Sequence, residues 1–330
     1  MAMSPPKQPG HPPGAGDEPE ALLTQGPDQR PGTHSRGMPM ALMTWGLVLL
    51  VLLFVVVLVV AKLASSGGHP PNGAVPPVTE APPSLSSALA SVPLQGQDVP
   101  GAAGMSAVTP PVMLSGVPPL ESGGLPLVFY TGAEFCPYCA AERWALAVAL
   151  ERFGTLSKLA VTSSSSQEVF GGTPSLSFRG ASYSSRFVAF EAVEQYADRP
   201  ASGSTTGFAA TASLRPVEEA IVRRFDAPPY VSAVEAGALP FVDIGGKAVM
   251  VGSGFSPAVL GGSSVGSVAA DLHDPASNVY SAVVGEANLL TAAICEATGG
   301  KPGSVCAQPV IDLAAAVLGS PRANLGRASK

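Results

Sequence analysis

The feature that most constrains this chain is a run of twenty residues without a charge, from Leu42 to Ala61. A helix of that length rises about 30 Å, which matches the hydrocarbon core of a bilayer. Trp45 lies near one end of the run and Lys62 follows the other, as interfacial anchors do. A buried helix of a soluble domain is disfavoured because the run has no polar face. We therefore predict one transmembrane helix within residues 41–63.

Basic residues are distributed unevenly around this span. Arg30 and Arg36 lie on its amino-terminal side, whereas the next basic residue after Lys62 is Arg143. This asymmetry predicts that the tail, residues 1–40, is cytoplasmic and that the rest of the chain lies outside the cell membrane. A cleaved signal peptide is the alternative. It is disfavoured because about forty residues precede the apolar run and no A-x-A cleavage site follows it directly.

Composition places the folded part of the chain after the span. The chain has 330 residues with 34 Pro, and much of the proline precedes residue 120. Proline-rich segments with few aromatic residues cannot bury enough apolar surface to offset the entropy of ordering. We therefore predict a disordered tail, a solvated Pro/Ser/Ala-rich linker, one globular domain and a flexible tail, at residues 1–40, 64–120, 121–320 and 321–330.

The charge balance argues against nucleic acid as a partner. The formal net charge is -6, and the longest basic cluster is Arg223-Arg224, whereas a phosphate backbone requires a basic stripe. The four cysteines form two local pairs. Such pairs suit an oxidising compartment, and cytosolic redox or zinc sites stay open as alternatives.

The predicted domain begins with an apolar run typical of a buried strand, Leu127–Tyr130. A helix is predicted over Ala140–Phe153, with Gly154 as its C-cap. Leu159–Val161 is predicted to be a second strand, parallel to the first through a helical crossover. A weaker strand is expected near Phe187–Phe190.

Five further elements are predicted downstream. Pro216–Phe225 is predicted to be a short helix, since Pro is at its start and acidic residues are in its first turn. Leu239–Val251 contains two short strands around Gly245-Gly246, which is a hairpin signal. Helices are also predicted over Ala276–Ala297 and Pro309–Leu318.

The strongest functional signal is Cys136-Pro137-Tyr138-Cys139, a C-x-x-C between a predicted strand and a predicted helix. The thiolate attacks disulfides, and the free N–H groups and positive dipole of a helix amino terminus lower a thiol pKa. We predict that Cys136, at an exposed helix mouth, is the nucleophile. Cys139, one turn further, then resolves the mixed disulfide. Pro137 takes a first-turn position, where its missing N–H costs little.

Two other interpretations of this pair stay open. A C-x-x-C is also half of a zinc site, but zinc needs four ligands, and the only histidine beyond residue 69 is His273. A structural disulfide is the second alternative, although so short a loop between two cysteines suits reversible redox exchange better than permanent cross-linking.

Pro240 would by itself be read as an edge or turn residue. Its combination with the C-x-x-C and the hairpin weakens that reading, and a cis peptide at Leu239-Pro240 would be a deliberate feature of a tight turn.

With the strand, the C-x-x-C helix and the proline before the hairpin, the sequence resembles the thioredoxin superfamily. Around Phe135–Ala145 it is similar to the family catalogued as domain of unknown function 929, and the resemblance covers roughly residues 121–320. The resemblance implies an α/β, thioredoxin-like fold with extra helices. It also implies that Leu239 and Pro240 form a cis-proline loop that faces the cysteine pair, contacts the substrate backbone and discourages metal binding.

The sequence departs from thioredoxins at Phe135, where they carry tryptophan. The preceding Glu134 would raise the pKa of Cys136 if close, or serve in proton transfer, and a solvated loop glutamate is the alternative. Arg143 is expected to be a surface or ion-pair residue. Cys295 and Cys306, with ten residues between them, are expected to form a structural disulfide. The alternative is a second redox couple that relays electrons to the first.

These predictions combine into a membrane-anchored, extracytoplasmic thiol-disulfide oxidoreductase that needs no cofactor. Its expected partners are cysteine-containing secreted or surface proteins, and a quinone-linked membrane oxidase or a membrane reductant would renew the pair. The alternative from another class is a non-catalytic thioredoxin-like module that binds peptides in its cis-proline groove. Oxidase, reductase and isomerase activities are not distinguished by this sequence.

Overall fold

The computed structural model describes residues 78–94, 105, 108–201 and 207–319. The predicted cytoplasmic tail 1–40, the transmembrane helix 41–63 and the tail 321–330 lie outside these ranges. In the part of the chain that is described, no helix is long and apolar enough to cross a membrane.

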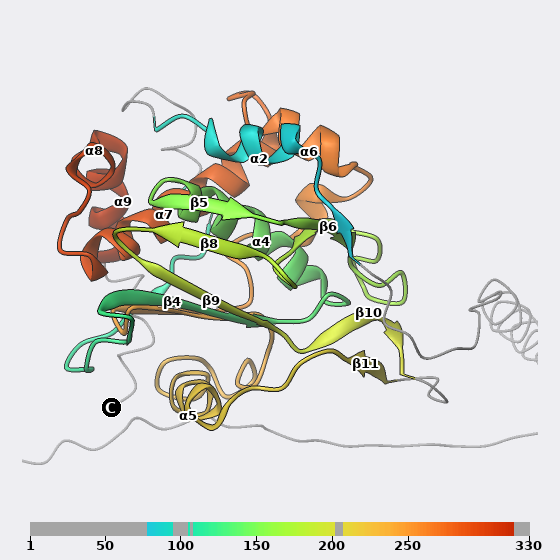
Figure 1. The fold of residues 1–330 in the computed structure, drawn as a ribbon, viewed down its shortest axis with the longest axis horizontal. Coiled ribbons are helices and arrows are strands. Elements are labelled where there is room, and N and C mark those ends of the chain that lie inside the picture. Colours follow the sequence, from blue (N-terminus) through green and yellow to red (C-terminus); the bar gives the residue numbers. More distant parts are fainter. Residues whose placement is uncertain (1–77, 95–104, 106–107, 202–206, 320–330) are drawn as a thin grey trace, which may run out of the picture. The chain divides into compact units, whose positions relative to one another are not determined.

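A mixed α/β domain is organised around a six-stranded sheet (Figure 1). Along the sheet the strands follow the order β2-β13-β12-β4-β3, and β9 also pairs with β4. β4 is parallel to β9 and antiparallel to β12. The strands are β2 (Val112–Met113), β3 (Glu121–Ser122), β4 (Leu125–Gly132), β9 (Ala189–Glu194), β12 (Phe241–Ile244) and β13 (Ala248–Val251). A parallel β-α-β unit and an antiparallel hairpin therefore meet at β4.

Helices cover both faces of this sheet (Figure 1). α4 (Pro137–Glu151) and α7 (Asn278–Ala297) lie on one face, and α5 (Pro216–Phe225) lies on the other. Alternate residues of β4 supply the two cores: Val128 and Tyr130 pack on the α4 side, whereas Phe129 packs toward α5. Most of α4 is buried because it is enclosed by the sheet, α7 and other helices.

Smaller elements complete the domain. Two further antiparallel two-stranded sheets are formed by β5 (Gly154–Ser157) with β8 (Ser182–Ser185) and by β10 (Tyr196–Pro200) with β11 (Phe208–Ala210). The short helices are α2 (Pro83–Ala90), α6 (Val265–Asp271), α8 (Gly303–Cys306), α9 (Pro309–Gly319) and the 3-10 turn η1 (Pro257–Leu260).

The parallel partner of β4 differs from the predicted one. The predicted strand at Leu159–Val161 becomes β6 (Ala160–Ser163), which pairs antiparallel with β1 (Thr79–Glu80) and β7 (Pro174–Ser177) in a separate sheet. β9 takes the parallel position, at the weaker strand predicted near Phe187–Phe190. The prediction was wrong because β7 follows β6 closely in the chain and pairs with it. The chain forms a strand beside β4 only later, at β9.

Two other expectations need correction. Gly154 does not cap α4: Arg152 is the C-cap, and Gly154 opens β5, where a Cβ would lie 2.4 Å from Ser184 O. The predicted solvated linker 64–120 is wrong for its described part, since Leu85 and Leu89 of α2 are buried in the main core. The apolar residues of α2 are few and lie among prolines and serines, so composition concealed them.

Other predicted elements are confirmed. α5 has the predicted bounds, and α7 and α9 match the predicted helices to within two residues. The β12–β13 hairpin turns at Gly245 and Gly246, with φ angles of 60° and 66°. Glycine suits this turn because both central residues adopt the left-handed conformation.

Candidate dithiol site

Cys136 and Cys139 lie where the chain passes from β4 into α4. Cys136 is the N-cap of the helix, and Pro137 takes its first position, as predicted. Cys136 Sγ accepts a hydrogen bond from Cys139 N–H at 3.3 Å. Cys139 Sγ in turn accepts one from Ala133 N–H at 3.4 Å. Both sulfurs therefore meet backbone donors at the start of the helix.

The two thiols differ in burial and in acidity. Cys136 is 7% exposed and Cys139 is fully buried, so the predicted exposed position of Cys136 is wrong. Phe135 and Leu239 pack against the pair. Hydrogen bonds from the Cys139 side chain and backbone lower the pKa of Cys136, outweighing desolvation. Burial raises the pKa of Cys139 well above its ordinary value. The predicted asymmetry is therefore present.

The loop before β12 faces the nucleophile. The Leu239-Pro240 peptide bond is cis, as predicted. The Cys136 thiol donates to Leu239 O at a sulfur–oxygen distance of 3.6 Å. Pro240 is buried, and Leu239 is partly exposed. The structure therefore brings this loop, far away in sequence, against the cysteine pair.

Arg143 is fully buried and fixes the loop in front of the cysteines. Its Nε and Nη2 donate to the Glu194 carboxylate at 2.8 and 2.7 Å. Nη2 also donates to Ala133 O at 2.7 Å, and Nη1 donates to Ser175 Oγ at 3.2 Å. Of the two expected roles, the ion pair is confirmed and the surface position is wrong. The guanidinium holds residue 133, whose N–H faces Cys139.

Glu134 is buried rather than solvated. It is 2% exposed, and its carboxylate accepts hydrogen bonds from Arg179 at 3.0 and 3.1 Å and from Ser177 Oγ at 2.8 Å. The alternative of a solvated loop glutamate is therefore wrong. The ion pair with Arg179 balances the charge of this carboxylate beside the site.

Aromatic side chains border the pair. Phe135 stacks on Phe208 of β11, with ring centroids 3.9 Å apart and an interplanar angle of 6°. Tyr138 is 43% exposed and meets Phe170 edge to face at 6.0 Å between centroids. Sequence reasoning missed Phe208 and Phe170 because no local pattern links them to the C-x-x-C. Together these rings form a partly exposed aromatic rim.

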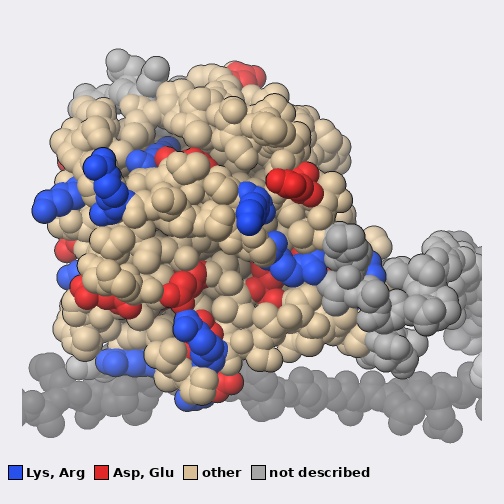
Figure 2. Space-filling model, viewed as in Figure 1, with Lys and Arg blue, Asp and Glu red and all other residues tan. Residues whose placement is uncertain are grey.

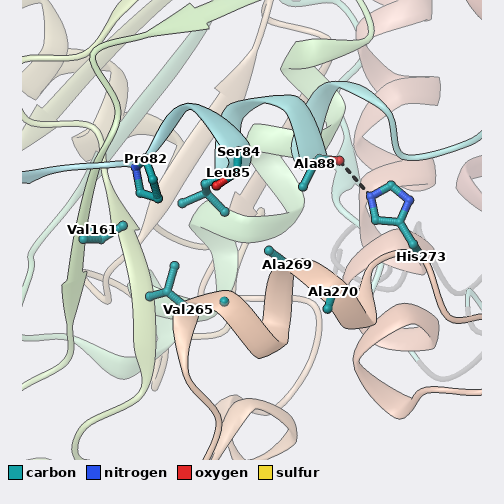
Figure 3. A pocket seen from close by; sticks show the side chains of 10 residues that line it. Pro82, Ser84, Leu85, Ala88, Val161, Val265, Ala269, Ala270 and His273 are labelled. Atoms are coloured by element: carbon teal, nitrogen blue, oxygen red, sulfur yellow. Dashed lines mark hydrogen bonds between the residues drawn. The ribbon is translucent and has the colours of Figure 1, made fainter.

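Other parts of the domain offer less chemistry. Among the residues described, no group of three or more His, Cys, Asp or Glu side chains could hold a metal ion. An apolar hollow of about 430 Å³ lies between α2 and α6 (Figure 3). Aliphatic side chains such as Leu85 and Val265 line it, and His273 at its edge lies 3.0 Å from Ala88 O. The hollow contains no thiol or carboxylate.

Charges of both signs are interspersed on one face of the described domain. On the face shown in Figure 2, basic and acidic residues of the described chain alternate among uncharged ones and form no continuous basic stripe.

The second cysteine pair, Cys295 and Cys306, forms a disulfide with a Cα–Cα distance of 5.6 Å. It connects the end of α7 to α8.

Comparison with known proteins identifies part of the chain. Residues 112–206 match a family described as a domain of unknown function (DUF929). Neither the curated proteins nor the solved structures gave a match. The matched stretch contains β4, the cysteine pair, α4 and β9. The predicted similarity to this family is therefore confirmed over the segment that forms the parallel half of the sheet and the dithiol.

Proposed function

We propose that this protein is a thiol-disulfide oxidoreductase with a thioredoxin-like fold. The observation that carries the proposal is the asymmetry of one cysteine pair at a helix amino terminus. Cys136 caps α4 with its sulfur and has a lowered pKa, whereas Cys139 is buried behind it with a raised pKa. A nucleophile and a resolving thiol require such a difference.

The arrangement of the sheet supports the thioredoxin-like part of this proposal. The three features behind the resemblance meet at one place: the strand β4, the C-x-x-C at the start of α4 and the cis-proline loop before β12. α4 comes after β4 in the chain and α7 comes after the β12–β13 hairpin, and both helices cover the same face of the sheet. The elements that a thioredoxin-like protein uses for exchange are thus all positioned by β4.

The proposed chemistry balances without a cofactor. The Cys136 thiolate attacks a client disulfide, a bond forms to one client sulfur, and the other leaves as a thiolate that takes a proton. Cys139 then loses its proton and attacks Cys136, which releases the second client sulfur as a thiol. The client gains two electrons and the pair becomes oxidised, and the reverse sequence oxidises a client dithiol. A quinone-linked membrane oxidase or a membrane reductant would renew the pair.

Thiol acidity and turnover test this proposal. Alkylation at mildly acid pH should label Cys136 well before Cys139, with a midpoint below the ~8.5 of an unperturbed thiol. The same protein should exchange with a small-molecule disulfide. Cys295 and Cys306, which are bonded to each other, serve as the unlabelled control. Equal, slow labelling without turnover would favour the alternative, a non-catalytic module that binds peptides against the aromatic rim.

We further propose that the domain lies outside the cell membrane, anchored by the apolar run at residues 42–61. The Cys295–Cys306 disulfide supports an oxidising compartment. The clients would then be secreted or surface proteins. A topology reporter fused after Lys330 should read as extracytoplasmic, and the same reporter fused after residue 40 should read as cytoplasmic. A cytoplasmic signal from the Lys330 fusion would overturn this orientation.

A further inference from the structure

Tyr130 presents a buried hydroxyl next to the dithiol. The residue is fully buried near the end of β4, and its Oη has no hydrogen-bond partner among the residues described. Its ring packs edge to face on Phe178 with centroids 5.2 Å apart, and the Arg143 guanidinium lies 5.9 Å from its centroid. A phenylalanine would fill the same space without leaving a donor unpaired, which costs free energy. Packing therefore does not account for the hydroxyl.

Gly132 shows where this hydroxyl points. A Cβ on Gly132 would lie 2.1 Å from Tyr130 Oη and 3.1 Å from Cys139 Sγ. The hydroxyl and the sulfur therefore border the same small volume, in which there is no room for a side chain at position 132. The glycine allows Tyr130 to reach toward the resolving cysteine.

Cys139 needs a donor of this kind when it acts. Burial raises its thiol pKa, and Ala133 N–H, at 3.4 Å, is its backbone donor. As the attacking thiolate it stops donating to Cys136 and becomes a buried anion. Burial also raises the pKa of Tyr130 well above 10.0, so its hydroxyl keeps its proton at neutral pH. A buried anion and an unpaired donor are complementary.

We propose that Tyr130 is a positioning residue for the resolving step, because its hydroxyl donates a hydrogen bond to the Cys139 thiolate. The inference rests on the proposed exchange function. In this step the Cys139–Cys136 bond forms and the bond from Cys136 to the client sulfur breaks. The proton lost by Cys139 ends on the departing client sulfur. Tyr130 keeps its own proton, and only its hydrogen bond changes.

The test compares Tyr130→Phe with the parent protein in a full-length Cys136→Ser background. Cys139 is then the free thiol, because the other two cysteines are bonded to each other. Titration of thiolate absorbance should show that losing the hydroxyl lowers the ionisation constant of Cys139 roughly tenfold. In the protein with both cysteines, Tyr130→Phe should slow resolution of a preformed mixed disulfide by a similar factor and leave the first attack by Cys136 unchanged.

Tyr183→Phe is the matched control. Its hydroxyl donates to Leu150 O at 2.9 Å, which lies near the opposite end of α4 from Cys139. This variant should change neither the Cys139 titration nor the resolution rate. A second measurement leaves Tyr130 intact: in the Cys136→Ser protein, its ring resonances should titrate with the same midpoint as the sulfur.

The outcomes separate the two ideas. Two results would overturn the role of Tyr130. One is an unchanged Cys139 titration in Tyr130→Phe, and the other is Tyr130 ring resonances that do not shift when Cys139 ionises. A Cys139 titration that responds as expected in a protein without any exchange activity would support the hydrogen bond and overturn the oxidoreductase proposal instead.

Discussion

Replacing Cys139 by alanine should convert the protein into a trap for its clients. Cys136 would keep its place at the amino terminus of α4, where the backbone N–H of residue 139 points at its sulfur. It would still attack a client disulfide, but no second thiol would displace the client. The Cys139 side chain also lowers the pKa of Cys136. The trap should therefore need a somewhat higher pH than the native pair.

Non-reducing electrophoresis followed by mass spectrometry measures this result. Mixed disulfides through Cys136 should accumulate in Cys139→Ala, while turnover falls to background. Cys136→Ala should lose both turnover and adducts, because the remaining thiol is fully buried with a raised pKa. A variant with Cys295 and Cys306 replaced by Ala is the control for the other pair and should form no stable adducts. Adducts through Cys139 in Cys136→Ala would reverse the assigned roles.

The dithiol could be predicted because its parts are close in sequence. β4, the turn and the start of α4 follow one another, so helix-terminus chemistry places both sulfurs before any long-range contact is known. Pro240 was found as well, since the glycine turn after it marks the hairpin. These signals depend on turn residues and on cysteine spacing, and both act on the conformation of a short stretch of chain.

The surroundings of the dithiol could not be predicted in the same way. Glu194, which pairs with Arg143, and Phe208, which stacks on Phe135, come from distant segments that no local pattern connects to the motif. Tyr130 looked like one more apolar residue of a buried strand. Only the folded structure shows that its hydroxyl lies beside Gly132 and near the sulfur of Cys139 on α4.

Buried carboxylates show the same limit. Glu142 of α4 and Glu286 of α7 are both fully buried, and neither carboxylate oxygen of Glu142 has a hydrogen-bond partner among the described residues. Burial raises the pKa of Glu142 well above its ordinary value and that of Glu286 to about 7. Glu286 also accepts the Gly254 N–H at 2.6 Å. A glutamate in a sequence is expected to be exposed to solvent. That these two are buried becomes evident only when α4 and α7 pack against each other.

Breaking the Arg143–Glu194 pair should be among the most destabilising single changes at the site. In Arg143→Met the side chain still fills space, but Glu194 is left buried without its cation and Ala133 O loses a donor. Removing one partner of a buried pair costs about 3–5 kcal/mol. Arg143 also lowers the pKa of Cys136, so that pKa should rise in the variant. Urea unfolding followed by the fluorescence of buried Trp144, together with alkylation of Cys136, measures both effects.

The exposed pair Arg223–Glu219, whose side chains are 69% and 51% exposed, is the matched control. Arg223→Met should change the unfolding free energy little, because water already solvates both charges. Replacing Glu194 by Gln together with Arg143→Met should recover part of the loss, since no buried carboxylate then lacks a cation. Equal effects of Arg143→Met and Arg223→Met would contradict a buried pair. A large loss of stability with an unchanged Cys136 pKa would confine Arg143 to holding the fold.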